Sequence, residues 1–308
     1  MSIVDELMNK ARGAGGRVVL PEGLDGRVIE AANKLVDEDL AVPVLLGDED
    51  LSNNPQFSAY VAELVANSKH DQAEAEGLLK NPLYFAGMMV RMGDADALVA
   101  GAANPTADVL RAGLKTVGLA AGIRRMSSFF LMDIPNVAGQ GPRSFIFADC
   151  AVNIDPPAED LADIAIASAH TARAWLGAEP RVAMLSFSSR GSAAHEDVEK
   201  VIQALAIAKE RAPELNIDGE FQLDTAIVPS VAARKVPEAS EVAGKANVLI
   251  FPNLDSANIG YKLTQYMGNA QAIGPFLQGF AKPVCDLSRG ASVEDIVSAS
   301  AITLAMAD

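Results

Sequence analysis

Strand, turn and helix follow one another in Val284-Cys285-Asp286-Leu287-Ser288-Arg289-Gly290-Ala291-Ser292-Val293-Glu294-Asp295. In α/β proteins, the turn that joins a strand to a helix is where chemistry is usually placed. Arg289 suits an anionic substrate, because a guanidinium pairs with two oxygens of a phosphate or carboxylate. The hydroxyl of Ser288 can stabilise a developing oxyanion, and a nearby aspartate can move a proton. The turn therefore indicates acyl or phosphoryl chemistry on an anionic substrate.

The same residues also fit purely structural roles. Ser292, followed three residues later by Asp295, is typical of a helix N-cap with an acidic first turn. Spacing alone favours this helix-start role for Asp295. Ser288 fits an ordinary turn residue and Arg289 a solvated surface residue. The catalytic interpretation therefore needs support from the rest of the chain.

Composition limits the class of protein. The chain has 308 residues, half of them hydrophobic, which is enough for one large or two ordinary domains. Its formal net charge of -15 argues against a nucleic acid or an anionic membrane surface as partner. An anionic substrate would then need a local basic pocket, so individual arginines carry weight.

Cysteine usage and hydropathy indicate the compartment. Cys150 and Cys285 lie far apart, in apolar surroundings, so we expect free buried thiols and a reducing environment. The first eight residues are acidic and lack the basic start of a signal peptide. No apolar run reaches the roughly 18 residues that indicate a membrane span. We expect a soluble cytoplasmic protein.

Apolar strand-like runs alternate with helical patterns along most of the chain. Turn residues end the runs at 18–20, 42–46, 97–100, 181–187 and 248–251. This alternation predicts an α/β fold with a largely parallel sheet. Residues 127–135 and 144–153 break it and are typical of an antiparallel strand pair, where the chain could enter a second domain.

Three further turns are candidate sites. Residues 186–192 place Ser186, Ser188, Ser189 and an arginine between a strand and a helix, where free N–H groups can hold a phosphate. An ordinary polar loop with Ser192 as N-cap fits equally. Thr106 lies near a helix start with Arg111 five residues later, and the alternative is a cap followed by a solvated arginine. Asn258 and Lys262 share a helix face.

Missing motifs narrow the alternatives. The glycine-rich residues 13–16 precede a strand instead of following it, so they are no dinucleotide fingerprint. There is no Walker A sequence and no nucleophile elbow of the GxSxG type. The histidines His70, His170 and His195 lack zinc-ligand spacing. Dinucleotide-binding, P-loop, nucleophile-elbow and zinc-binding signatures are therefore missing from the sequence.

These residues together resemble the phosphate acetyltransferase (phosphotransacetylase) family over nearly the whole chain. The matching stretches are Val19-Leu20-Pro21-Glu22-Gly23, Ala97-Leu98-Val99-Ala100-Gly101, Thr106-Ala107-Asp108, Phe147-Ala148-Asp149-Cys150-Ala151-Val152-Asn153, Ser186 to Ser192, Ala226-Ile227-Val228-Pro229, Ala246-Asn247-Val248-Leu249-Ile250-Phe251-Pro252, Asn258-Ile259-Gly260-Tyr261-Lys262-Leu263, Ala272-Ile273-Gly274-Pro275 and Asp286-Leu287-Ser288-Arg289-Gly290.

The resemblance implies two α/β domains flanking a cleft, in a fold like that of isocitrate and isopropylmalate dehydrogenases. The expected first domain is residues 1–122 plus 278–308, and the second is 123–277, entered through the antiparallel pair. The implied reaction is acetyl transfer between coenzyme A and phosphate, with coenzyme A as a substrate and with no metal and no other cofactor. The family also implies a homodimer.

The implied mechanism is direct attack in a ternary complex. Asp295 would accept the proton of the CoA thiol, and Ser288 would bind the oxyanion. Arg289, Arg111 and Thr106 would bind phosphoryl oxygens. The candidates for coenzyme A and cleft contacts are Ser186, Ser188, Ser189, Asn258, Lys262 and Tyr266.

Two positions depart from the family pattern. The resemblance implies arginines at Ser68, before Lys69-His70, and at Tyr266, after Gln265. Their replacement predicts weaker CoA binding, a different acyl preference or contacts supplied from elsewhere. The alternatives are a phosphotransacylase for propionyl or butyryl groups and a non-catalytic acyl-CoA-sensing module like the C-terminal domain of malic enzymes. A dehydrogenase of the same fold is disfavoured by the missing metal-carboxylate and nucleotide motifs.

Overall fold

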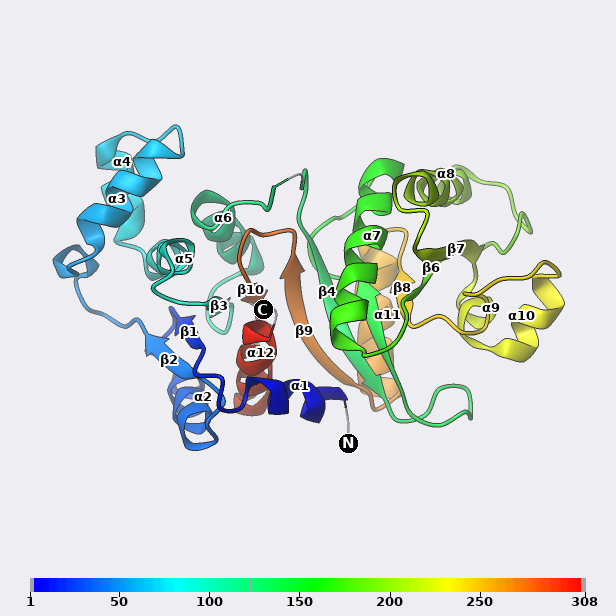
Figure 1. Ribbon diagram of the computed structural model, residues 1–308, viewed down its shortest axis with the longest axis horizontal. Coiled ribbons are helices and arrows are strands. Elements are labelled where there is room, and N and C mark those ends of the chain that lie inside the picture. The colour runs from blue at the N-terminus through cyan, green and yellow to red at the C-terminus, as the bar shows by residue number, and fades with distance from the viewer. Residues whose placement is uncertain (1–2, 122, 306–308) are drawn as a thin grey trace. The chain divides into compact units, whose positions relative to one another are not determined.

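The computed structural model describes residues 3–121 and 123–305, in two compact units (Figure 1). Unit 1 comprises Met1–Met126 and Gly274–Asp308, and unit 2 comprises Ser127–Ile273. The expected boundary at residue 122 falls on a residue outside the described ones. In both units helices alternate with mostly parallel strands, so the predicted α/β fold is confirmed.

Unit 1 has the strand order β2-β1-β3-β10-β9. Neighbouring strands are parallel except for the pair β9 and β10. The register aligns Asp286 with Ala100, so β3 and β10 end level. The strands of unit 1 are β1 (Arg17–Leu20), β2 (Val42–Leu45), β3 (Ala97–Ala100), β10 (Val284–Asp286) and β9 (Gln271–Gln278), of which residues 271–273 belong to unit 2.

Helices cover both faces of the unit 1 strands. In Figure 1, α1, α2 and α12 lie on one side, and α5 and α6 lie on the other. Strand β3 is buried throughout and β1 is buried from Val18 onward, as parallel strands covered on both faces should be. The helices are α1 (Ile3–Ala11), α2 (Gly26–Asp37), η1 (Leu51–Asn53), α3 (Phe57–Ala66), α4 (Gln72–Leu79), α5 (Pro82–Met92), α6 (Thr106–Thr116) and α12 (Val293–Leu304).

Unit 2 has the strand order β4-β5-β8-β6-β7. The pair β4 and β5 is antiparallel, as predicted, and the remaining neighbours are parallel. Phe130 on β4 stacks on Tyr261 of α11 at a centroid distance of 4.2 Å, inside the unit 2 core. The strands are β4 (Ser127–Ile134), β5 (Arg143–Ala148), β6 (Arg181–Leu185), β7 (Asn216–Phe221) and β8 (Val248–Ile250).

Two helices of unit 2 begin with a side-chain cap, from His195 and from Asn253, and the other three begin without one. His195 caps α8 by accepting the N–H of Asp197, so the expected cap role of Ser192 is wrong. The helices are α7 (Ala158–Trp175), α8 (Glu196–Arg211), α9 (Leu223–Ile227), α10 (Pro229–Lys235) and α11 (Leu254–Met267).

Several element ends differ from the predicted ones. The strands expected to reach Leu46, Phe187 and Phe251 end one or two residues earlier, at Leu45, Leu185 and Ile250. Helices α3, α4 and α5 and strands β7 and β9 were not predicted. Both cysteines are free and buried, as expected. Within the described residues, no helix is long and apolar enough to cross a membrane.

Candidate active site

The turn after β10 is held against the end of β3 by the backbone. The N–H of Leu287 donates to the carbonyl oxygen of Ala100 at 2.6 Å, which continues the pairing of the two strands by one residue. Gly101 adopts φ 108°, and a Cβ on it would lie 2.5 Å from Asp286 Oδ1. Only glycine permits both this backbone conformation and this approach. The two turns are therefore in direct contact.

Arg27, in the first turn of α2, forms hydrogen bonds to three turns: the turn before α2, the turn after β3 and the turn after β10. Its Nη1 donates to the carbonyl oxygens of Arg289 and Ala291, each at 2.9 Å. Its Nη2 donates to the carbonyl oxygen of Ala102 at 2.8 Å and to Asp25 at 2.7 Å. Asp25 also caps α2, and its bond to Arg27 lowers its pKa. The rigid guanidinium fork thus fixes the turn that carries Ser288 and Arg289.

Glu22 organises the turn after β3. Its buried carboxylate accepts the backbone N–H groups of Gly101, Ala102, Ala103 and Asn104 and the side-chain amide of Asn104. One carboxylate thereby satisfies a run of N–H groups that no strand or helix uses. Neither Glu22 nor Arg27 was predicted as part of the site. The available signal was the polar run Glu22-Gly23 directly after a buried strand.

Ser288 and Arg289 are both exposed at the tip of the turn. Ser288 Oγ accepts the N–H of Gly290 at 3.3 Å, so its own proton remains available to a substrate. The backbone of Arg289 is held by Arg27, while its guanidinium forms no ion pair among the described residues. Both side chains are therefore positioned by the backbone and free to bind an anion.

Asp295 forms the predicted cap of α12. Its Oδ2 accepts the backbone N–H of Ser292 at 2.9 Å and the Ser292 hydroxyl at 2.8 Å, and its own N–H donates back to Ser292 Oγ. This reciprocal pair is a capping box. The side chain is exposed, on the helix that follows Ser288 and Arg289. Both of these hydrogen bonds reach Oδ2, which leaves Oδ1 for a further partner.

Thr106 and Arg111 lie on α6. Pro105 occupies the N-cap position, so Thr106 is the first helical residue and not the cap. The Thr106 hydroxyl donates to Asp286 Oδ2 at 2.6 Å, which links α6 to the end of β10. Arg111 is exposed and pairs with Asp108 at 2.5 Å. The structure thus brings Thr106 to the Ser288 turn through Asp286.

Asp286 is the most perturbed carboxyl of this site. It is 1% exposed, and burial raises its pKa to about 7, with the charge of Glu22 acting in the same direction and the Thr106 hydrogen bond opposing. Its Oδ1 has no hydrogen-bond partner among the described residues. A carboxyl that titrates near neutral pH beside a candidate site is a functional signal.

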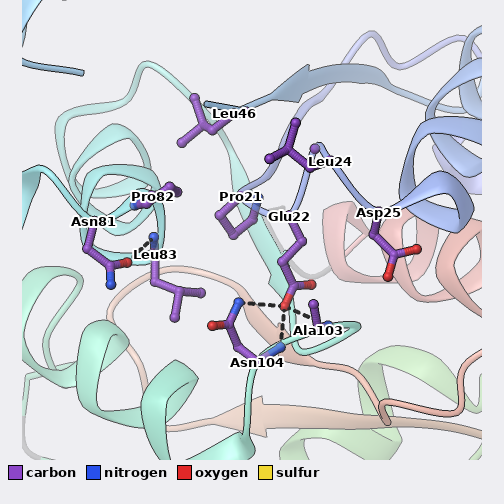
Figure 2. Close-up of a pocket in the computed structure, with 12 residues that line it drawn as sticks. Pro21, Glu22, Leu24, Asp25, Leu46, Asn81, Pro82, Leu83, Ala103 and Asn104 are labelled. Atoms are coloured by element: carbon purple, nitrogen blue, oxygen red, sulfur yellow. Dashed lines mark hydrogen bonds between the residues drawn. The ribbon is translucent and has the colours of Figure 1, made fainter. Parts of the chain in front are cut away.

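A cavity of about 260 Å³ lies beside these turns (Figure 2). Its walls come from the turns after β1, β2 and β3 and from the start of α5. In Figure 2 the Glu22 carboxylate points toward Asn104, and Asn81 caps α5 at Leu83. The lining residues are Pro21, Glu22, Gly23, Leu24, Asp25, Leu46, Gly47, Asn81, Pro82, Leu83, Ala103 and Asn104.

The serine-rich turn of unit 2 is largely committed to its own structure. Ser188 is fully buried and donates to Glu220 at 2.8 Å. Ser189 is buried, accepts the N–H of Gln222 and contacts the Thr225 hydroxyl. Ser186 is partly exposed, and its hydroxyl accepts the N–H of Ser188. Of the three serines, Ser186 is the one with access to solvent.

Arg190 anchors the same turn. It adopts φ 49° and makes a bidentate pair with Asp218 at 2.8 and 3.0 Å. It also donates to the carbonyl oxygen of Gly219 and lies 5.1 Å from the centroid of the Phe221 ring. Its fork is therefore used inside unit 2. This arginine therefore helps to hold the turn through contacts within unit 2.

The α11 candidates lie on an accessible face. Asn258 donates a weak hydrogen bond of 3.4 Å to the carbonyl oxygen of Cys150. Lys262 Nζ lies 5.0 Å from the centroid of the Tyr261 ring and is exposed. Tyr266 is 79% exposed. In unit 1, Ser68 is partly exposed and its hydroxyl accepts the N–H of His70.

No group of three His, Cys, Asp or Glu side chains suited to a metal ion occurs among the described residues. The donor groups of the site are hydroxyls, guanidiniums and backbone N–H groups, which bind anions. Ser288 and Arg289 are exposed on one turn, Thr106 reaches the end of β10 through Asp286, and the Asp295 carboxylate lies on the helix that follows. This combination fits acyl transfer involving a phosphate.

Comparisons with known proteins agree with this chemistry. Residues 2–304 match the family described as Phosphate acetyl/butaryl transferase. The phosphate acetyltransferase of Thermoanaerobacterium thermosaccharolyticum is 46% identical over a 328-residue alignment that covers 100% of both chains. A phosphotransacetylase structure from Streptococcus pyogenes has a TM-score of 0.91 and 41% identity, over 99% of this chain and 98% of that chain.

A more distant likeness concerns the fold alone. The structure of 4-hydroxythreonine-4-phosphate dehydrogenase from Klebsiella pneumoniae has a TM-score of 0.53 at 12% identity, over 96% of this chain and 100% of that chain. This likeness is consistent with the predicted dehydrogenase-like architecture.

Proposed function

Because the chain belongs to the Phosphate acetyl/butaryl transferase family, we propose that it transfers an acetyl group between coenzyme A and inorganic phosphate. The protein is an acyltransferase, and the names of its full-length relatives favour acetyl over longer groups and over a non-catalytic sensing role. The observation that carries the proposal is the contact between the turns after β3 and β10, which places Thr106 beside the turn of Ser288 and Arg289.

The reaction is a direct attack in a ternary complex. In the direction of acetyl-CoA synthesis, Asp295 accepts the proton of the CoA thiol and the thiolate sulfur attacks the carbonyl carbon of acetyl phosphate. The Ser288 hydroxyl donates to the oxyanion of the tetrahedral intermediate. The carbon–oxygen bond to phosphate then breaks and phosphate leaves. Asp295 can act as base while capped, because its two hydrogen bonds from Ser292 reach Oδ2 only.

Arg289, Arg111 and Thr106 hold the phosphoryl group. The Arg289 guanidinium is exposed while its backbone is fixed, a combination that limits the entropy lost on binding. Arg111 pairs with Asp108 at the surface, and such exposed pairs are weak enough to be exchanged for phosphate. Two guanidiniums offset the phosphate charge locally within an acidic protein.

Coenzyme A is contacted by Ser186, Asn258, Lys262 and Tyr266 of unit 2. Lys262 supplies a positive charge for a CoA phosphate, and the exposed Tyr266 supplies a ring face on which a base can stack. Ser188 and Ser189 act indirectly, because their hydroxyls hold the turn that carries Ser186. Coenzyme A is a substrate here, and the proposed reaction uses no metal or other cofactor.

A cytoplasmic homodimer is the proposed working form. Ile259, Leu263 and Met267 of α11 are 58%, 50% and 81% exposed and follow one another at helical spacing. Exposed apolar stripes of this kind mark interaction surfaces. The cytoplasmic location is supported by two free buried thiols, which suit a reducing compartment. Sedimentation of the purified chain tests the dimer.

An activity assay tests the proposed reaction. The initial rate of phosphate-dependent thiol release from acetyl-CoA is measured beside propionyl-CoA and butyryl-CoA. We expect acetyl-CoA to be turned over fastest and Arg289→Ala to reduce kcat/KM for phosphate by about 100-fold or more. The matched control is Arg12→Ala, which removes an exposed arginine with a long 3.8 Å pair to Glu38. No turnover of any acyl-CoA would overturn the proposal.

A further inference from the structure

A buried carboxyl, that of Asp286, accepts the hydroxyl of Thr106. Asp286 ends β10, two residues before Ser288, and is 1% exposed. Its Oδ2 accepts the Thr106 hydroxyl at 2.6 Å, and its Oδ1 has no hydrogen-bond partner within the described part of the chain. A buried carboxylate usually accepts several hydrogen bonds. Asp286 is therefore poorly suited to carry a charge.

The surroundings of Asp286 add a second carboxylate. Gly101 contacts both acids: its N–H donates to Glu22, and a Cβ at this position would lie 2.5 Å from Asp286 Oδ1. Glu22 is satisfied by the N–H groups of the turn after β3, whereas Asp286 has one donor. Burial and the Glu22 charge raise the pKa of Asp286 to about 7, against the opposing effect of the Thr106 hydrogen bond.

Other charged groups near β10 are already paired or exposed. Cys285 is a buried thiol whose pKa is raised by burial and by Asp286, so it stays neutral. The strands β3 and β9 carry no titratable residue. On α6, Asp108 pairs with Arg111 and Lys115 is exposed; on α12, Glu294 pairs with Lys34 and Asp295 bonds to Ser292; on α2, Arg27 bonds to Asp25.

The direction of the hydrogen bond between Thr106 and Asp286 depends on whether Asp286 is protonated. A threonine hydroxyl has a single proton. When Asp286 is ionised, that proton points to Oδ2, and Thr106 offers only lone pairs to a substrate. The unprotonated oxygens of phosphate are acceptors, so this state gives them no donor and turns lone pairs toward them. When Oδ2 carries a proton, it donates to Thr106 Oγ1, and the Thr106 proton becomes available to a phosphoryl oxygen.

We propose that Asp286 is a positioning residue that sets the direction of the Thr106 hydrogen bond, and that phosphate binds together with a proton taken up by Asp286 from solvent. The proposal rests on the proposed acetyl transfer, since it assigns the phosphate site to Thr106. Bound phosphate favours the neutral form of Asp286, because the anion disfavours a second negative charge beside it. In turn, the neutral form of Asp286 favours phosphate binding, because it leaves the Thr106 proton free to be donated. Binding and protonation are therefore linked.

The test is the pH profile of kcat/KM for inorganic phosphate in wild type and Asp286→Asn, measured from about pH 6 to pH 9. An asparagine Nδ2–H can donate to Thr106 permanently, as the protonated acid does. We expect wild type to lose up to about tenfold in kcat/KM per pH unit above about pH 7 relative to Asp286→Asn. Phosphate ionises in the same range, but its effect is common to both proteins. A wild-type profile parallel to that of the variant would overturn the proposal.

A second measurement does not depend on the Asp286 variant. Calorimetry of phosphate binding, in two buffers that differ in ionisation enthalpy, gives the protons taken up per phosphate by wild type and by Thr106→Val. We expect wild type to take up more protons than Thr106→Val, in which the responding hydroxyl is gone. Equal uptake would contradict the coupling. If the wild-type enzyme were inactive at every pH, the proposed acetyl transfer itself would be wrong. A failure of the proposed function can therefore be distinguished from a failure of the proton coupling.

Discussion

Arg27 Nη1 donates a 2.9 Å hydrogen bond to the carbonyl oxygen of Arg289, 262 residues further along the chain. The same guanidinium also reaches Ala291, Ala102 and Asp25. A lysine keeps the charge but cannot serve four acceptors in one plane. We expect Arg27→Lys to lower kcat/KM by about 10- to 100-fold, since small displacements of positioned groups are costly. Steady-state kinetics measures this.

The control for Arg27 is Arg17→Lys, in which an arginine near the start of β1 also bonds to a carbonyl oxygen, that of Gly93. This bond lies at the other end of the strand, away from the turns of the site. We expect wild-type kinetics from Arg17→Lys. If Arg27→Lys keeps wild-type kinetics, and circular dichroism shows that its fold is intact, then the hydrogen bonds of the Arg27 guanidinium do not position Arg289.

Glu22→Gln is expected to lower the free energy of unfolding by about 2–4 kcal/mol. The buried carboxylate accepts N–H groups from Gly101 to Asn104, and an amide places its own N–H₂ against some of these donors. Urea denaturation of wild type and variant gives the difference. Glu30→Gln, on the exposed face of α2, is the matched control. A loss no larger than that of Glu30→Gln would mean that Glu22 does not organise the turn.

The turn at Ser288 shows what could be predicted from the sequence. The order strand, turn and capped helix is local, and the Ser292–Asp295 box was read correctly from spacing. Glu22, Arg27 and Asp286 were not assigned because their partners lie tens to hundreds of residues away. Likewise, Ser188 and Ser189 form an apparent phosphate turn by sequence, yet the structure buries both against β7 and α9. Local sequence patterns predict the helices and strands, whereas tertiary contacts decide which polar side chains remain available to a ligand.

Asp218 is expected to make unit 2 sensitive to acid. Burial opposes its charge, but hydrogen bonds from Ser240 and Gly219 and the charges of Arg190 and Lys209 leave its pKa below 3.8. A carboxyl whose folded pKa is depressed stabilises the fold above its unfolded pKa and loses this contribution as the pH falls. Asp218→Asn should therefore be less stable than wild type at pH 7.

The difference between wild type and Asp218→Asn should shrink as the pH is lowered from about 5 toward about 2. Thermal or urea unfolding at several pH values measures it. A difference that stays constant over this range would show that the Asp218 charge makes no contribution. Asp163, which is partly exposed and pairs with Arg211, gives the control Asp163→Asn.

Tyr266→Arg is expected to tighten CoA binding. The family resemblance implies an arginine here, and the side chain is 79% exposed on α11, one turn after Lys262. A second cation beside Lys262 should lower KM for CoA by about 3- to 10-fold at low salt, and the gain should decline as ionic strength rises. The control is Asn269→Arg, which adds the same charge just beyond the helix. It distinguishes a contact between residue 266 and CoA from a general attraction of CoA by added positive charge. An equal effect from both variants would contradict a role for position 266.

The rate of acetyl-CoA formation by Asp295→Asn beside Ser292→Ala tests the central assignment most directly. Asparagine can still accept the Ser292 N–H but cannot take a thiol proton, whereas Ser292→Ala weakens the cap by about 1 kcal/mol and keeps the carboxylate. We predict a loss of about 100-fold or more in kcat for Asp295→Asn and a rate within a few-fold of wild type for Ser292→Ala. Near-wild-type turnover by Asp295→Asn would reduce Asp295 to a helix cap and contradict the proposed base.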